Sequence, residues 1–169
     1  MRTVAGEGVV LEPQVAAHAP EMFALLADPA IYEYENAPPE SLEWLAQRFA
    51  RLESRGSPDG RETWLNWIVR LPSGEAVGYV QATIDASRTA SIAYIFASRF
   101  WGRGLARRAV EAMTGELRDH YAARAMIVVL KAVNERSLQL AQRLGFAKAP
   151  DQSGIEADEI RMRRALQPP

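Results

Sequence analysis

Apolar and polar residues are arranged along this chain with a period that changes from one segment to the next. A short apolar run at 9–11, closed by Glu12 and Pro13, predicts a first strand. Apolar positions three and four residues apart then predict amphipathic helices over 16–27 and 42–52. The first part of the chain is therefore expected to be mainly helical after one strand.

Strand periods dominate the middle of the chain. Residues 64–71 and 76–84 have the composition of strands and flank a turn at 72–74. Residues 91–97 form a further run that is rich in isoleucine and aromatic side chains. Three strands joined by short turns predict an antiparallel meander.

The last part of the chain returns to helical spacing. Amphipathic helices are predicted over 105–117 and 134–144. The near-continuous apolar run at 125–132 between them predicts a strand buried on both faces. Residues 146–149 and 159–166 predict two last strands.

These elements together predict a single α+β domain over residues 1–169. We expect a mixed, mostly antiparallel central sheet of about seven strands, flanked by about four helices. A chain of 169 residues can bury roughly 70% of the surface that its unfolded form exposes, so it needs no disulfide or structural metal to fold.

Composition excludes several function classes. Cysteine is absent, which rules out thiol nucleophiles, cysteine zinc sites, iron–sulfur clusters and redox pairs, and the two histidines, His18 and His120, argue against a multi-histidine metal site. No apolar stretch approaches the ~18 residues of a membrane span, and the first residues do not form a signal peptide. We therefore expect a cytoplasmic protein with no membrane partner. The net charge of only -1 argues against a nucleic-acid partner as well.

That net charge hides an uneven division. Residues 3–47 contain no Lys or Arg and eight acids, which are Glu7, Glu12, Glu21, Asp28, Glu33, Glu35, Glu40 and Glu43. The chain from Arg48 onward carries 19 basic and 13 acidic residues. The fold is expected to hold these two populations in different places.

A glycine-containing loop after the strand at 91–97 is a candidate anion site. Gly102 and Gly104 let the backbone approach a ligand, and the helix that follows offers unpaired N–H groups suited to a pyrophosphate. Four arginines add positive charge: Arg99, Arg103, Arg107 and Arg108. A plain strand-to-helix turn with solvated arginines explains the same residues equally well, and the P-loop and Rossmann spacings are both missing.

A second candidate segment directly follows the buried strand. Asn134 is suited to cap the next helix, Ser137 stands three residues later, and Gly145 ends the helix. Capping alone accounts for this pattern. It is also compatible with ligand binding, because the start of this helix lies at the edge of the sheet where ligands bind.

Together the two segments resemble the GNAT superfamily of acyl-CoA-dependent N-acyltransferases. The resemblance is carried by Trp101-Gly102-Arg103-Gly104-Leu105-Ala106 and, after the buried strand, by Asn134, Ser137, Ala141, Leu144, Gly145 and Phe146. It spans nearly the whole chain and is strongest to the bacterial ribosomal-protein N-terminal acetyltransferase branch. Trp101 departs from the Gln or Arg of the broad family pattern, but Trp is common in this branch.

The resemblance implies acetyl-CoA as a co-substrate and no metal. The fourth strand, at 91–97, would splay from the fifth, at 125–132, to admit the pantetheine arm. Contacts with coenzyme A would come from Tyr94, Phe96, Trp101, Gly102, Arg103, Gly104, Leu105, Ala106, Arg107 and Asn134. The N–H of Ile95 would polarise the thioester carbonyl as an oxyanion donor.

The resemblance also bears on proton transfer. Many family members have a Tyr seven residues after the Asn to protonate the leaving thiolate, and this chain has Ala141 there. Ser137 occupies the position of an alternative donor, acting through a hydrogen bond or a water.

The general base and the acceptor pocket are less clearly marked. By the resemblance, Glu33 and Glu35 would lie at the acceptor mouth, and Glu62 is a further candidate, although a solvated surface acid is the more common role for each. Aromatic candidates for the pocket are Tyr32, Tyr34, Trp44, Trp64 and Trp67, with core packing the alternative for the tryptophans.

The sequence thus predicts direct transfer of an acetyl group from acetyl-CoA to a primary amine, on a protein N-terminus or a small cationic molecule. The acid-rich stretch at 3–47 motivates the cationic acceptor. Three alternatives stay open: a non-catalytic acyl-CoA sensor, a transferase for a longer acyl-CoA such as succinyl-CoA, and a phosphate-binding module unrelated to coenzyme A. Homodimers are common in the family, so a homodimer is an option that no residue here specifies.

Overall fold

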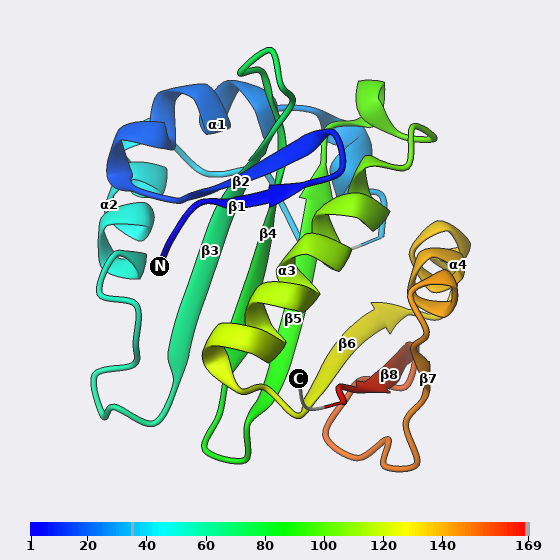
Figure 1. Cartoon of the computed structure of the whole chain (residues 1–169). Helices are drawn as coiled ribbons and strands as arrows, with labels where there is room; N and C mark the ends of the chain where they lie inside the picture. Colours follow the sequence, from blue (N-terminus) through cyan, green and yellow to red (C-terminus); the bar gives the residue numbers. More distant parts are fainter. Residues whose placement is uncertain (35, 168–169) are drawn as a thin grey trace.

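The described residues, 1–34 and 36–167 of a computed structural model, contain one sheet of eight strands (Figure 1). The strands are β1 Val4–Gly6, β2 Val9–Pro13, β3 Thr63–Arg70, β4 Ala76–Ile84, β5 Thr89–Phe96, β6 Ala125–Lys131, β7 Ala147–Lys148 and β8 Glu159–Ala165. Their order across the sheet is β1-β2-β3-β4-β5-β6-β8-β7, and only β5 and β6 run parallel. The mixed, mostly antiparallel α+β fold is confirmed.

Helices cover both faces of the sheet. They are η1 Ala16–His18, α1 Ala19–Leu25, η2 Pro29–Tyr32, α2 Leu42–Leu52, η3 Ser98–Phe100, α3 Leu105–Tyr121 and α4 Glu135–Arg143. On one face, Arg70 of β3 binds Glu21 of α1 with an Nη2–Oε2 distance of 2.9 Å. On the other face, Thr114 of α3 meets the sulfur of Met126 in β6, and α3 crosses the front of the sheet in Figure 1.

Two local details differ from the sequence pattern. The sheet has eight strands because β1 is a further strand, and its three residues are too few to show a period. The helix predicted over 16–27 is a 3-10 turn followed by α1, which begins at Ala19. Pro20 occupies the first turn of α1, where its missing N–H costs no hydrogen bond.

The sheet opens between β5 and β6. The two strands pair only from Thr89 with Ala125 to Ser91 with Ile127. Beyond this point β5 follows β4 to its end and β6 follows β8 to its end, so the two halves of the sheet separate. The predicted splay between the strands at 91–97 and 125–132 is confirmed.

No helix in the described part of the chain is long and apolar enough to cross a membrane.

Candidate functional site: a cavity at the opening of the sheet

A cavity of about 1020 Å³ lies where β5 and β6 separate. One side, which we call the donor channel, is lined by Tyr94, Phe96, Trp101, Gly102, Gly104, Arg107, Val129, Asn134 and Ser137. The other side, the acceptor chamber, is lined by Gln14, Trp44, Arg48, Tyr79 and Gln81. The donor channel thus holds most of the residues that the sequence predicted, and the acceptor chamber holds residues that it mostly did not.

The register of β5 decides which backbone groups face the opening. Hydrogen bonds from Ala97 to Val77 (3.1 Å) and from Asp85 to Thr89 (3.1 Å) fix the bonded pairs between β4 and β5 at odd-numbered residues of β5. Even-numbered residues therefore turn their N–H and C=O groups toward β6. Beyond the last pairing with β6, these are Tyr94 and Phe96.

This register corrects the prediction for Ile95. Its backbone groups face Tyr79 of β4, so its N–H is not free to act as an oxyanion donor. A Cβ added to Gly78 would lie 2.1 Å from the carbonyl oxygen of Ile95, which shows how closely that carbonyl approaches β4. The free N–H groups at the opening are those of Tyr94 and Phe96, the residues on either side of Ile95 in β5.

The facing strand contributes a backbone group that the sequence did not single out. Bonds from Leu166 to Arg124 (2.8 Å) and from Ala132 to Asp158 (2.7 Å) direct even-numbered residues of β6 toward β8. Val129 therefore turns its N–H and C=O into the opening. Only the strand pairing could have identified it, because its side chain is an ordinary part of an apolar run.

The glycine loop lines the donor channel at the start of α3. Gly102 (φ 76°) and Gly104 (φ 72°) have left-handed backbone conformations that favour glycine. Gly104 is the N-cap of the 17-residue helix α3 and offers no side chain, so the first N–H groups of the helix are left for a ligand. Trp101 donates from Nε1 to the carbonyl of Phe96 (2.8 Å), which ties the loop to the open edge of β5.

Only part of the predicted arginine group lines this channel. Arg107 does, whereas Arg99 lies 3.7 Å from a carboxylate oxygen of Glu75 and Arg103 is exposed outside the lining. Leu105 is buried in the core and Ala106 is half-buried, so neither side chain reaches the cavity. These two residues can contribute only their backbone.

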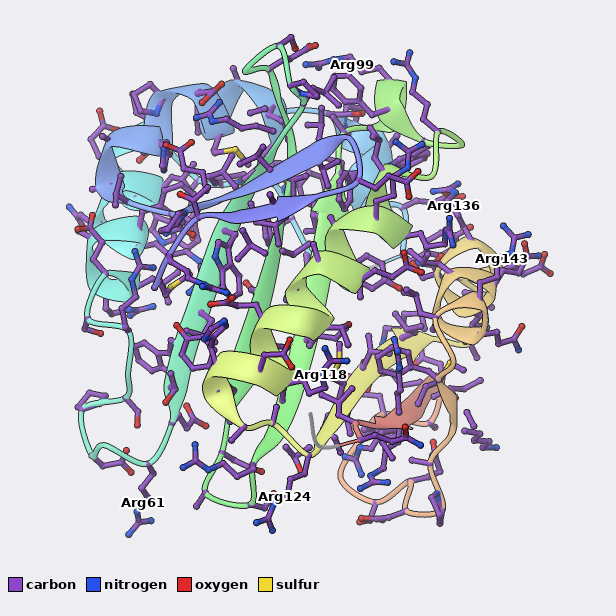
Figure 2. All side chains as sticks on the ribbon, in the orientation of Figure 1. Arg61, Arg99, Arg118, Arg124, Arg136 and Arg143 are labelled. Carbon is purple, nitrogen blue, oxygen red and sulfur yellow. The ribbon has the colours of Figure 1, made fainter. Side chains whose placement is uncertain are left out.

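Helix α4 supplies arginines that the sequence analysis missed. Arg136 and Arg143 lie two turns apart on one face of α4, and both line the cavity. Figure 2 shows them projecting from α4, whereas Arg61 and Arg124 lie at the opposite end of the sheet. Arg136 stacks over the ring of Trp101 at 3.7 Å from its centroid.

The start of α4 places two hydroxyl groups beside the channel. Asn134 accepts a hydrogen bond from the N–H of Ser137 (3.1 Å), which confirms its capping geometry. Tyr94 donates from its hydroxyl to the carbonyl of Ser137 (3.4 Å), across the opening of the sheet. Burial raises the pKa of Tyr94 to about 12, so this hydroxyl keeps its proton at neutral pH.

The acceptor chamber lies on the α1–α2 face of the sheet. Tyr79 is the ladder partner of Ile95, and Gln81 is the partner of Ala93, so both lie one strand from the opening. Burial raises the pKa of Tyr79 to about 12. Arg48 of α2 lines the same cavity, with its Cζ 5.6 Å from the centroid of the Trp44 ring.

The acid-rich segment at 3–47 contributes to the cavity wall, but not through its acids. None of its described acids lines the cavity. Glu33 is exposed, with Oε2 4.0 Å from Nη2 of Arg136. Asp28 instead accepts from the N–H of Ser98 (2.7 Å), and the hydrogen bonds from Ser98 hold the pKa of this carboxyl below its usual range. Glu35 lies outside the described residues.

The remaining candidates divide between cavity and scaffold. Tyr32, Tyr34 and Trp44 line the cavity, whereas Trp67 is a core residue that donates to the carbonyl of Arg2 (3.1 Å). Glu62 accepts from Nε1 of Trp64 (2.9 Å) and neither residue lines the cavity. Among the described residues, no group of three or more His, Asp or Glu side chains is placed to hold a metal ion.

Comparisons with known proteins agree with this geometry. Residues 9–147 match the model of the acetyltransferase (GNAT) domain family. Similar solved structures include a spermidine N-acetyltransferase chimera from Vibrio cholerae and hSSAT (18% identity, 94% of this chain and 96% of that chain covered, TM-score 0.78). The ribosomal alpha-N-protein acetyltransferase RimL in complex with coenzyme A (16%, 97% and 98%, 0.78) is another.

A third similar structure is the ribosomal-protein-S5-alanine acetyltransferase from Vibrio fischeri (17% identity, 96% of each chain covered, TM-score 0.77). Among curated protein sequences, none matches the chain significantly. Identities this low show a shared fold and leave the acceptor to be argued from the cavity itself.

Proposed function

We propose that this chain transfers an acetyl group directly to a primary amine. It belongs to the GNAT acetyltransferase family and is thus an acetyl-CoA-dependent N-acetyltransferase. The observation that carries this proposal is the single cavity of about 1020 Å³ that joins the start of α3 to the face of α2 through the opened sheet. A donor entering from one side and an amine from the other meet at the edge of β5.

The donor channel fits a coenzyme A thioester. The first N–H groups of α3, beyond Gly104, suit a pyrophosphate, and the free backbone groups of Val129 suit the amides of a pantetheine arm. The N–H groups of Tyr94 and Phe96 replace Ile95 as the donors that would polarise the thioester carbonyl. Acetyl-CoA supplies the activated acetyl group when bound.

Two hydroxyl groups are placed to assist the departing thiolate. Ser137 lines the cavity at the first turn of α4, and Tyr94 reaches its backbone from β5. Ser137 can donate a hydrogen bond to a thiolate, whereas Tyr94 can do so only by giving up its bond to the carbonyl of Ser137. They stand in for the family tyrosine that Ala141 replaces.

The attacking amine must lose its proton. No described carboxylate or histidine lines the cavity, and Tyr79, with its pKa raised to about 12, holds its own proton. The amine therefore enters as the free base or passes its proton to water. Glu35, predicted from the sequence as a base, remains the candidate to test from the acceptor loop.

The experiment is to supply acetyl-CoA and a panel of primary amines, measuring free thiol and the acetylated product by mass spectrometry. We expect stoichiometric thiol and acetyl-amine. Binding of acetyl-CoA with no product would favour the non-catalytic sensor, and faster turnover with succinyl-CoA would favour the longer donor. If ATP bound as tightly as acetyl-CoA in calorimetry, the phosphate-binding module would replace both.

A further inference from the structure

The acceptor chamber presents hydrogen-bond donors and a positive charge, which bears on the acceptor's chemistry and rests on the proposed function. Arg48 contributes the charge, and the floor beneath it is made of Gln14, Tyr79 and Gln81. No acid among the described residues lines the cavity. A bound ligand is therefore expected to supply oxygen atoms that accept hydrogen bonds here.

Arg48 is free to bind such a ligand. Among the described residues it forms no ion pair and no side-chain hydrogen bond, whereas Arg107 and Arg136 lie within 3.4 Å and 4.0 Å of carboxylate oxygens. Its guanidinium faces the chamber closely enough to lower the pKa of Tyr79 against the stronger effect of burial. Its one close aromatic neighbour, Trp44, lies one turn earlier on α2 and supports the guanidinium from the side.

The floor adds a buried amide whose hydrogen bonding is incomplete. Gln14 is 4% exposed, and its Nε2 has no hydrogen-bond partner in the described residues. A buried amide without a partner is destabilising, and a ligand in the chamber can remove that cost by drawing the amide into a hydrogen bond. Gln14 is bonded to Asn66 through its backbone, and Asn66 pairs with Gln81, so these amides form a row across the sheet.

We infer that the acceptor is a small amine that also carries a carboxylate, and that Arg48 binds this carboxylate. Tyr79, which lines the cavity together with Arg48, pairs with Ile95, and adjacent strands are about 4.8 Å apart. A carboxylate held by Arg48 therefore leaves an amine a few bonds away at the open edge of β5, where the thioester carbonyl would lie. This acceptor replaces the cationic amine that the acid-rich sequence suggested, because the described acids of that segment lie outside the cavity lining.

The test compares an amino acid with its carboxamide as acceptors, in the wild-type protein and in Arg48→Gln. For each protein, kcat/KM for the amino acid is divided by kcat/KM for the carboxamide. Comparing this ratio between the wild-type protein and Arg48→Gln cancels the intrinsic reactivity of each amine. We expect Arg48→Gln to lower kcat/KM about tenfold for the amino acid, mainly through KM, and less than twofold for the carboxamide.

Arg51→Gln is the matched control, because Arg51 lies on the same helix, is exposed and does not line the cavity. Arg48→Lys should recover part of the preference. Equal losses for both acceptors, or no loss for either, would overturn the carboxylate assignment while leaving N-acetylation in place. If acetyl-CoA binds and no amine in the panel is acetylated, the proposed function fails first, and the acceptor assignment fails with it.

Discussion

The donor channel and the acceptor chamber share one cavity but are made of different parts of the chain. The donor channel depends on backbone groups: the first N–H groups of α3 after Gly104, the N–H groups of Tyr94 and Phe96, and the backbone of Val129. The acceptor chamber depends on side chains, of which Arg48 carries the positive charge. The donor channel is therefore formed by backbone features of the fold, and the acceptor chamber by side chains particular to this chain.

The difference follows from how each side would bind its ligand. A pyrophosphate and a chain of amides are recognised by N–H and C=O groups, which every residue carries once the strand pairing and helix start are fixed. An amine acceptor of unspecified shape is recognised by charge and by hydrogen bonds from particular side chains. Substitutions on the donor side should thus act on all acceptors alike, and those on the acceptor side should change their ranking.

The largest expected effect comes from the helix start. Gly104→Glu places a side chain and a negative charge where the pyrophosphate would lie, at a backbone φ of 72° that favours glycine. We expect acetyl-CoA affinity, measured by calorimetry, to fall at least about 100-fold for this combination of charge repulsion and lost N–H contacts.

Gly60→Glu is the control for backbone strain alone. Gly60 has a φ of 70° and no atom within 4 Å of an added Cβ, and it does not line the cavity. Unchanged affinity in Gly104→Glu, with Gly60→Glu also unchanged, would contradict the assignment of the start of α3 to acetyl-CoA binding. The donor channel would then no longer depend on these backbone groups.

The donor side could be predicted from sequence because its markers are local. The glycines at 102 and 104, the cap at Asn134 and the apolar run at 125–132 act within their own segment. Strand bounds were close for the same reason: the segment predicted at 76–84 is β4 without change. The opening between β5 and β6 was implied by the family resemblance that these segments carry.

The acceptor side could not be predicted, because its residues meet only in the folded chain. Arg48 stands on α2, far along the chain from Tyr79 and Gln81 of β4, and only the folded chain brings the three into one cavity lining. The error at Ile95 has a similar origin. The turn from Asp85 to Thr89 sets which residues of β5 bond to β4, and one residue of shift reverses every backbone group.

A smaller effect should separate chemistry from binding within the donor channel. Ser137→Ala keeps the cap, because the bond to Asn134 comes from the backbone N–H. If its hydroxyl assists the thiolate, kcat should fall about tenfold while acetyl-CoA affinity changes less than twofold. Tyr94→Phe, measured in parallel, tells which of the two hydroxyls carries this role. Equal losses in kcat and affinity for Ser137→Ala would leave it a binding residue only.

A smaller effect again is expected where the glycine loop meets β5. Trp101→Phe removes the hydrogen bond from Nε1 to the carbonyl of Phe96 (2.8 Å) but keeps an aromatic ring beneath Arg136. Loss of one neutral hydrogen bond, about 1 kcal/mol, should weaken acetyl-CoA binding about fivefold. Trp64→Phe removes an indole bond to Glu62 outside the cavity and should leave binding unchanged. Equal effects of the two substitutions would mean that the loop bond stabilises the fold and not the channel.

The smallest effect tests whether the acceptor side holds a base at all. Burial raises the pKa values of Tyr79 and Tyr94 to about 12, so both hydroxyls stay neutral from pH 6 to 9 and add no inflection there. The rise of kcat/KM with pH should then follow the pKa of the acceptor amine, shifting by one unit between acceptors whose amines differ by one unit. Glu33→Gln should change kcat less than twofold, because its carboxylate faces Arg136 outside the cavity lining. An inflection at the same pH for every acceptor, lost in Glu35→Gln, would instead show that the acceptor loop supplies the base.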